Sequence, residues 1–341
     1  MAEKSAEREK QNTTDAPACK VSVLCAAFNH EDFLRETLDS FLAQETNFPF
    51  EVLVNDDASA DGTAEILQEY AKKHPEIIRP FYQKENLYSR RMNVYDLVFF
   101  PAARGEYIAL CEGDDYWIDP EKLQRQVDWL DAHQDYSACV HNSIGKFADQ
   151  PDQVLFAQDG DRDIPFEQVI TGMSHAYHTS SILARREFIL NPPDYRNVAY
   201  EKGYFTDYAI GVRLCLEGKV RFLDRCMSVY RIGSNPSAWS KGVGQEYSKL
   251  TRFVSGEIAM LETLKSHDLT PEQLAATDRV ILERKYELLY LQGRVDEMVK
   301  PPYDQIHRSM GFGRVATTQL KRMFPRLHRL YRKNRGYGDA E

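Results

Sequence analysis

Residues 107–117 read YIALCEGDDYW, a short apolar run that ends abruptly in three carboxylates around a glycine. An apolar run of this length is typical of a buried strand, so the acids are expected at its carboxyl end. Ligands bind at that edge of an open α/β sheet, because the loops that leave the strands form a crevice there. A divalent cation holding a nucleoside diphosphate would relieve the repulsion among the acids. The alternative is a solvated acidic turn that leads into a helix, since the Asp-Pro pair at residues 119–120 suits a helix start.

Apolar runs and helical patterns alternate on both sides of this stretch. Residues 21–28 are apolar on both faces, which is typical of a central parallel strand that helices cover on each side. Strands are predicted over residues 21–28, 50–54, 77–82 and 138–141, and helices over 33–44, 61–70, 94–103 and 120–133. This order predicts an α/β fold, a three-layer sandwich with a mostly parallel central sheet.

The chain contains neither of the two common phosphate-binding sequences, G-x-G-x-x-G and G-x-x-x-x-G-K-[ST]. Another arrangement must therefore hold any phosphate group. Asp56 and Asp57 follow the predicted strand at 50–54, and that strand end is expected near the acids of residues 112–115. The carboxylates at the two strand ends would then converge on one crevice, where a metal ion is a natural bridge between them.

Composition describes a globular protein with an uneven charge distribution. The 341 residues are 43% hydrophobic, enough for one large domain with an appendage or for two domains. The net charge is −9, whereas residues 314–335 hold eight Lys or Arg and no acid. The six cysteines form no C-x-x-C pair and are expected as reduced core residues of a cytoplasmic protein. Residues 1–18 lack the apolar core of a signal peptide and are expected to be disordered, and no run reaches the roughly 18 apolar residues of a transmembrane helix.

The second half of the chain offers two further candidate sites. His175 and His178 lie in a polar segment before a strand-like run at 180–183, where they would contact a substrate or serve as structural histidines. Asp207 opens a helical pattern and is either an acid favoured by the helix dipole or a positioned base. Residues 159–163 resemble half of a calcium loop but lack its final glutamate, so a turn is expected. The remaining predicted elements are strands at 220–223 and 227–232 and helices at 250–267 and 271–291.

Five blocks of the chain, in this order and spacing, together resemble glycosyltransferase family 2, the inverting enzymes of the GT-A fold. The blocks are SVLCAAFN at 22–29, DDASADGT at 56–63, GEYI at 105–108, EGDDYW at 112–117 and FTD at 205–207. The resemblance implies transfer of a sugar from a nucleotide-diphosphate donor, with UDP- and dTDP-sugars favoured, to a hydroxyl acceptor in cell-surface glycan or polysaccharide synthesis. The expected divisions of the chain are a disordered N-terminus at 1–18, a GT-A domain at 19–242, a C-terminal helical region at 243–312 and a basic amphipathic tail at 313–341.

The resemblance also implies roles for residues on the donor side of the site. Ala26 and Phe28 would line the pocket for the base and ribose, and Asp57 would bind the base. Arg90 or Arg91 would reach the diphosphate, with Arg91 taken as the candidate. These positions all belong to the first half of the expected GT-A domain.

The same resemblance implies the metal ligand and the catalytic base. Asp114 would bind Mn²⁺ or Mg²⁺, Glu112 occupies the first carboxylate position of the motif, and Asp115 would support the diphosphate or the sugar. Asp207 falls where the family places its catalytic base. Many relatives supply a histidine to the metal just after the position of Arg231, whereas this chain continues Ile-Gly-Ser-Asn, so another group or water would complete the metal shell.

Two other functional classes compete with this interpretation. A glycoside hydrolase would use two carboxylates that flank a sugar, without a metal-diphosphate site, and the acids at two strand ends argue against it. A carbohydrate- or nucleotide-binding module that kept the fold and lost turnover is the non-enzymatic alternative. The presence of both Asp114 and Asp207 argues against such a module.

The basic tail has two interpretations. Its apolar residues fall on one helical stripe with basic residues around it, and Pro325 would kink a continuous helix. Such a segment would either dock on the body of the protein or bind the anionic inner face of the cell membrane. The expected partners are a nucleotide-sugar donor and a glycan or lipid-linked acceptor, with no nucleic acid, and a homo-oligomer contact remains open.

Overall fold

The computed structural model describes residues 19–156, 159–190, 193–201, 206–233 and 247–309. Ten strands in these ranges form one sheet, in the order β3-β2-β1-β4-β9-β6-β10-β5, with β7 paired to β6 and β8 to β10. The strands are β1 (Val21–Ala27), β2 (Phe50–Asp56), β3 (Ile78–Tyr82), β4 (Tyr107–Leu110), β5 (Tyr116–Trp117), β6 (Tyr136–Phe147), β7 (Gln153–Val154), β8 (Arg162–Ile164), β9 (Leu183–Arg185) and β10 (Lys219–Ile232).

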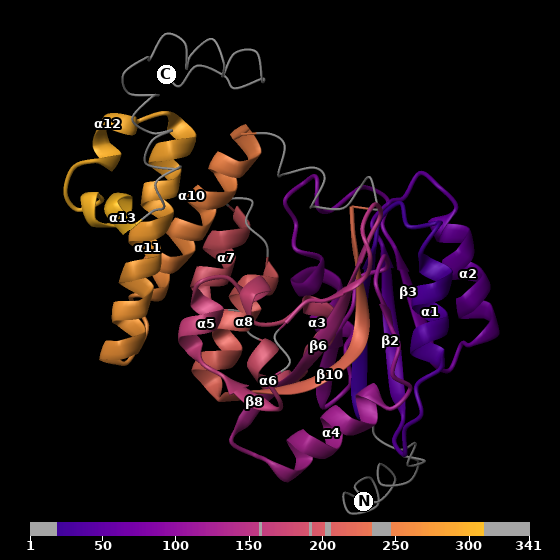
Figure 1. Cartoon of the computed structure of the whole chain (residues 1–341). Helices are drawn as coiled ribbons and strands as arrows, with labels where there is room; N and C mark the ends of the chain where they lie inside the picture. The colour runs from indigo at the N-terminus through magenta and orange to yellow at the C-terminus, as the bar shows by residue number, and fades with distance from the viewer. Residues whose placement is uncertain (1–18, 157–158, 191–192, 202–205, 234–246, 310–341) are drawn as a thin grey trace, which may run out of the picture.

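Helices cover both faces of the sheet and continue beyond it (Figure 1). The helices are α1 (Leu34–Leu42), α2 (Thr63–Lys73), α3 (Phe100–Ala102), α4 (Lys122–Ala132), α5 (Phe166–Ile170), α6 (Arg186–Ile189), α7 (Asp194–Glu201), α8 (Thr206–Glu217), α10 (Tyr247–Leu264), α11 (Pro271–Gln292), α12 (Val295–Met298) and α13 (Asp304–Ser309). A π-helical turn, η1 (Tyr95–Phe99), precedes α3, and two 3₁₀ turns are η2 (Met173–His175) and η3 (Thr179–Ser181).

Strand directions divide the sheet into two parts. Strands β3, β2, β1 and β4 are parallel to one another, and β10 runs parallel to β6. Between these parts lies β9, which is antiparallel to both β4 and β6. The α/β class and the C-terminal helices agree with the sequence prediction.

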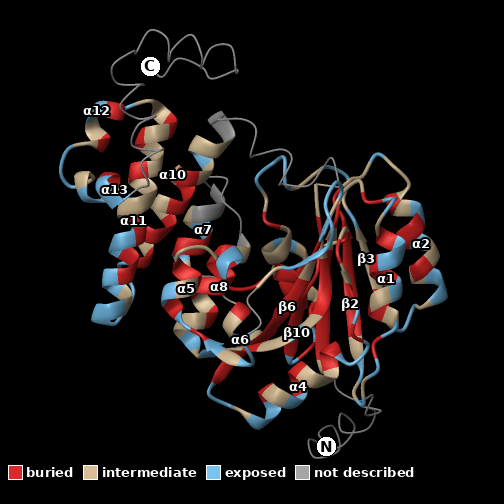
Figure 2. Cartoon of the chain, in the orientation of Figure 1, coloured by how far each residue is buried: buried red, intermediate tan, exposed pale blue. Residues whose placement is uncertain are grey.

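The sheet separates two hydrophobic cores, which explains why β1 is apolar on both faces. Val23 and Cys25 belong to the core that α1, α2 and α4 cover, whereas Leu24 belongs to the core under α3, α5 and α8. The central strands are accordingly buried along their length (Figure 2). Burial on both faces holds the strands in place, so the residues that follow their carboxyl ends have fixed positions along one edge of the sheet.

Several predicted elements differ in their bounds from the structure, and three of the differences have a clear physical cause. The two strands predicted over 220–232 are one strand, β10, because register shifts near Cys226 let it stay paired with β6. The strand predicted at 180–183 is wrong at its start, where the turn η3 stands instead. The His178 side chain accepts a hydrogen bond from the Ser180 N–H, and such local bonds compete with strand pairing. The helix predicted over 94–103 begins as the π-helical turn η1.

The C-terminal helices are joined to the core of the sheet. Met260 and Leu261 of α10 and Val280 of α11 share the hydrophobic core that lies under α8. A capping box of Thr270 and Gln273 begins α11. Within the described ranges, no helix is long and apolar enough to span a membrane. The predicted tail at 313–341 and the predicted N-terminal segment lie outside the described residues.

Candidate active site

The acidic loop, residues 111–115, leaves the carboxyl end of β4 and is held by the end of β1. The N–H of Cys111 donates to the Leu24 carbonyl at 3.1 Å, and the N–H of Gly113 donates to the Ala26 carbonyl at 2.8 Å. The carboxylates therefore lie at the sheet edge where the sequence predicts them. The solvated-turn alternative is weakened, because the loop is bonded to the neighbouring strand rather than projecting into water.

Arg231, near the end of β10, holds this loop from the other side. Its guanidinium donates to the Asp114 carbonyl and to the Glu36 carboxylate of α1, and it lies over the Tyr116 ring at 4.5 Å. Its backbone N–H donates to Asp115 Oδ1 at 3.0 Å. The side chain is only 5% exposed. Sequence reasoning used this residue only as a position marker, because nothing in its neighbourhood along the chain indicates a contact with β4.

Asp115 faces the protein interior. The residue is 1% exposed, and its Oδ2 lies 3.8 Å from His178 Nδ1. Burial, together with the charges of Asp114 and Glu112, raises the pKa of its carboxyl group well above the ordinary value. In this structure Asp115 bonds the acidic loop to β10, and its predicted contact with the diphosphate or sugar stays a prediction.

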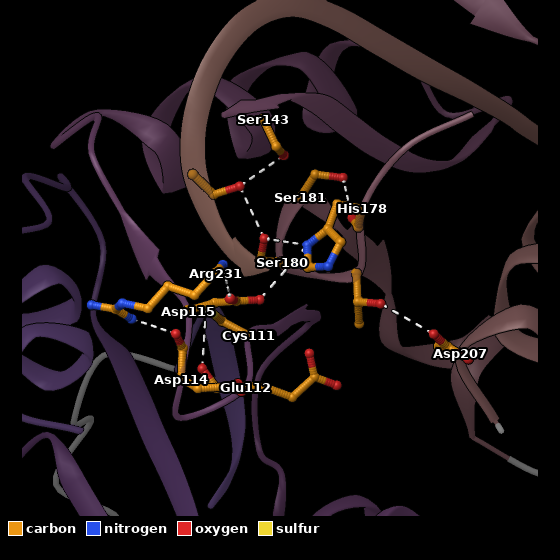
Figure 3. Close-up of polar contacts among 12 residues, drawn as sticks. Cys111, Glu112, Asp114, Asp115, Ser143, His178, Ser180, Ser181, Asp207 and Arg231 are labelled. Atoms are coloured by element: carbon orange, nitrogen blue, oxygen red, sulfur yellow. Dashed lines mark hydrogen bonds and ion pairs between the residues drawn. The ribbon is translucent and has the colours of Figure 1, made fainter. Parts of the chain in front are cut away.

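Glu112 points from the end of β4 toward the start of α8, where Asp207 lies (Figure 3). Burial raises the pKa of Glu112 to about 8, with further contributions from the charges of Asp114 and Asp207. The structure thus brings together two acids that come from distant parts of the chain. Two like charges disfavour each other's ionised form, so a cation or a shared proton would stabilise this pair.

Asp207 lies in the first turn of α8. Its Oδ1 accepts a hydrogen bond from the N–H of Tyr208 at 2.8 Å, and its Oδ2 accepts one from the Thr179 hydroxyl at 3.3 Å. Burial raises the pKa of this carboxyl group above the ordinary value for aspartate. Both interpretations from the sequence remain compatible with this geometry, since the acid sits at a helix start and also faces the acidic loop.

Asp57, the predicted base-binding residue, orders the loop that follows β3. Its N–H donates to the Ala27 carbonyl at 2.9 Å, which fixes it beside the end of β1. Its carboxylate accepts the N–H groups of Leu87 at 2.7 Å and Tyr88 at 3.1 Å. Asp57 therefore shapes the wall of the predicted nucleotide pocket, and each oxygen keeps a second lone pair for a ligand.

The other predicted donor-side residues occupy the same edge of the sheet. Ala26 and Phe28 are half-buried at the end of β1. Arg91 is exposed on the loop between β3 and η1, with a backbone φ of 56°. Their predicted contacts with the nucleotide stay predictions.

His30 is a residue of this edge to which sequence reasoning assigned no role. It is 8% exposed, its Nε2 lies 3.8 Å from Asp114 Oδ2, and its Nδ1 has no hydrogen-bond partner within the described part of the chain. Gly113 allows the close approach, because a Cβ there would lie 2.8 Å from His30 Nδ1. The sequence signal that could have identified His30 as a site residue is its position directly after β1, at the same sheet edge as the acids.

The carboxylates of the acidic loop fit one kind of metal site. The described ranges contain no group of three or more His, Cys, Asp or Glu arranged to hold an ion, so a closed protein cage does not fit. Mg²⁺ and related hard cations are often bound by one or two carboxylates and completed by phosphate oxygens and water. Asp114, with Glu112 beside it, fits a cation of that kind.

Comparisons with known proteins agree with this architecture. The family model described as Glycosyl transferase family 2 matches residues 22–185. Among solved structures, Staphylococcus aureus TarS 1–349 in complex with UDP-GlcNAc gives a TM-score of 0.58 at 19% identity, covering 80% of this chain and 73% of that chain. Mannosyltransferase PcManGT from Pyrobaculum calidifontis, in complex with GDP-Man and Mn²⁺, gives 0.54 at 16% identity, covering 96% and 88%. At these identities the likeness shows the fold, which is GT-A.

Relatives in sequence extend the comparison. An uncharacterized protein of Mycobacterium tuberculosis is 37% identical over 216 residues, or 62% of this chain and 58% of that protein. The putative teichuronic acid biosynthesis glycosyltransferase TuaG of Bacillus subtilis is 27% identical over 256 residues, covering 72% and 91%. The chain thus spans less than two thirds of the mycobacterial relative. The family model, the GT-A fold and the acid-bearing strand ends agree with one another: residues 22–185 match glycosyltransferase family 2, within a chain that has the GT-A fold.

Proposed function

We propose that the chain is an inverting glycosyltransferase that moves a sugar from a nucleoside-diphosphate donor to a hydroxyl acceptor, assisted by Mn²⁺ or Mg²⁺. The observation that carries this proposal is that Glu112, in the acidic loop after β4, points toward Asp207, at the start of α8, near the carboxyl edge of the sheet (Figure 3). An inverting transfer needs a group that receives the leaving diphosphate on one side and a base for the acceptor on the other.

The donor side consists of the ends of β1, β2 and β4. Ala26 and Phe28 would line the base and ribose, and Asp57 would contact the base while holding the loop at Leu87 in place. We favour UDP- or dTDP-sugars as donors. The fold neighbours whose complexes contain UDP-GlcNAc and GDP-Man support nucleoside-diphosphate sugars as the class.

Asp114 would hold the cation, with Glu112 beside it. A bound cation supplies Lewis-acid neutralisation of the charge that develops on the leaving phosphate oxygens. Arg231 keeps the Asp114 backbone in place through its hydrogen bond to the carbonyl, while Asp115 ties the same loop to β10. The backbone that carries the Asp114 carboxylate is thereby held in place before the donor arrives.

Asp207 would take the proton of the acceptor hydroxyl as the new C–O bond forms. Attack from the face opposite the diphosphate inverts the anomeric centre. The hydrogen bond from the Tyr208 N–H orients the carboxylate, and burial raises its pKa, which strengthens it as a base. The similarity to a putative teichuronic acid enzyme supports a cell-surface glycan as the acceptor class.

The test is nucleotide release from a panel of UDP-, dTDP- and GDP-sugars, with and without Mn²⁺, alongside thermal shifts with the corresponding nucleoside diphosphates. We expect cation-dependent release from one donor class, and its loss in Asp207→Asn with binding retained. Binding of a nucleotide without release from any sugar would instead identify a binding module that has lost turnover.

A further inference from the structure

Residues 178–181, HTSS, connect the acidic loop to the helix that carries Asp207 (Figure 3). At one end, the His178 ring stacks on Tyr230 with centroids 4.0 Å apart, and its Nδ1 lies 3.8 Å from Asp115 Oδ2. At the other end, the Thr179 hydroxyl donates to Asp207 Oδ2 at 3.3 Å. The short segment 178–181, which consists of His178 and the turn η3, therefore contacts both halves of the candidate active site.

This turn is anchored firmly to the sheet. Trp117 Nε1 donates to the Ser180 carbonyl at 3.0 Å, and Gln126 Nε2 donates to the Ser181 carbonyl at 2.9 Å. The Ser180 hydroxyl bonds the Ser228 hydroxyl of β10 at 2.9 Å. Ser180 and Ser181 are fully buried. The position of the backbone at Thr179 is consequently set by β5, α4 and β10, the elements that also border the acidic loop.

The Asp207 carboxylate needs a contact from outside its own helix to fix its position relative to the acidic loop. The bond from the Tyr208 N–H comes from its own helix, so it orients the carboxylate within α8 but does not locate it relative to the acidic loop. The bond from Thr179 crosses from the sheet to the helix. A carboxylate oxygen offers two lone-pair sites, so Oδ2 retains one for the proton of an acceptor hydroxyl while Thr179 occupies the other.

We propose that Thr179 is the positioning residue for the Asp207 carboxylate, and that its hydroxyl sets where the base stands relative to the leaving diphosphate. The inference rests on the proposed role of Asp207 as the base. Hydrogen bonds that serve catalysis are often long in the absence of substrate and tighten in the complex, which accounts for the 3.3 Å separation.

The hydroxyl has a second effect that separates positioning from packing. Donation of a hydrogen bond to a carboxylate favours its charged form, and the Thr179 hydroxyl lowers the pKa of Asp207 against the larger effect of burial. A threonine that only fills space would have no such effect. Among the residues that the structure describes, the other titratable groups that face Asp207 are Glu112 from the acidic loop, Tyr95 from η1, Tyr177 beside η3 and Tyr230 from β10.

The experiment compares Thr179→Val, which removes the hydroxyl at nearly constant shape, with Thr179→Ser, which keeps it. The donor is the nucleotide sugar that turns over in the panel above, and kcat/KM is measured across pH. We expect Thr179→Val to lose about 10- to 100-fold in kcat/KM, since misplacement of a reacting group costs on that order. The acidic limb of its profile should move upward by about one pH unit, because loss of a hydrogen bond to a charged group shifts a pKa by that much. Thr179→Ser should restore both values.

Calorimetry with the nucleoside diphosphate and Mn²⁺ completes the test, and the affinity should be unchanged in both variants. A wild-type rate and pH profile in Thr179→Val would overturn the inference, as would equal losses in the serine variant without a shift of the acidic limb. Thr179→Ala provides a second hydroxyl-free variant where the valine variant folds poorly. Activity retained in Asp207→Asn would refute the proposed base itself, whereas an inactive Asp207→Asn beside a fully active Thr179→Val would refute only the role of Thr179.

Discussion

Replacement of Arg231 by methionine tests how much of the site depends on the contact between β10 and β4. Methionine keeps a long apolar stem but cannot donate to the Asp114 carbonyl. A carbonyl left without its donor costs about 1–3 kcal/mol when fully buried, and the Asp114 carbonyl is partly buried. The lost cation–π contact with Tyr116 costs about 1 kcal/mol. The ion pair with Glu36 adds little, because that carboxylate is 54% exposed. With the carbonyl at the low end of that range, we expect a loss of about 2–3 kcal/mol in the free energy of unfolding.

Urea denaturation of the wild type, Arg231→Met and Glu36→Gln measures this value. Glu36→Gln is the matched control, since it removes only the exposed partner, and it should change the free energy by about 0–1 kcal/mol. Arg231→Met should also bind a nucleoside diphosphate with Mn²⁺ more weakly than Glu36→Gln does, because the acidic loop has lost its second support. Equal stability and equal affinity in the two variants would refute the reasoning that Arg231 holds the Asp114 backbone.

Four further predictions follow from the same structure and sequence. Asp114→Ala should abolish Mn²⁺-dependent nucleotide binding in calorimetry, because the remaining Glu112 and Asp115 do not hold both ion and diphosphate, and unchanged affinity would contradict the metal assignment. Asp207→Asn should keep donor binding and lose about 10²-fold or more in turnover, whereas near-normal transfer would leave Asp207 as a helix-start acid. Burial lowers the pKa of Lys122 to about 7 from an ordinary value of 10.5, so the unfolded chain binds more protons between these values and stability should rise with pH across that window. In Lys122→Met this rise should shrink by the lysine contribution, as pH-dependent urea denaturation would show. Full-length protein should sediment with anionic liposomes at low salt and a chain ending at Gly313 should not, and identical behaviour of the two would remove the membrane role of the tail.

Individual elements show where sequence reasoning succeeds and where it stops. The helix predicted over 271–291 from its helical pattern is α11, Pro271–Gln292. In the structure a capping box begins it and a glycine with φ of 74° follows its end. The break predicted within 220–232 is absent, because β10 stays paired with β6 on both sides of its register shifts near Cys226. A break in an apolar pattern therefore marks a bulge as readily as a strand end, and only the partner strand distinguishes them.

The sequence by itself determined that acids stand at the carboxyl edge of a sheet. Apolar runs specify buried strands, and parallel strands carry the residues that follow them to one edge, so the placement of Asp57 and residues 112–115 needs only local information. Tertiary structure decided which residues meet those acids. Arg231 and Thr179 reach the site because β9 inserts between β4 and β6, with β10 beside β6. That order arises from packing among strands that lie far apart in the chain. Their apolar patterns are similar, so the patterns do not specify which strand pairs with which.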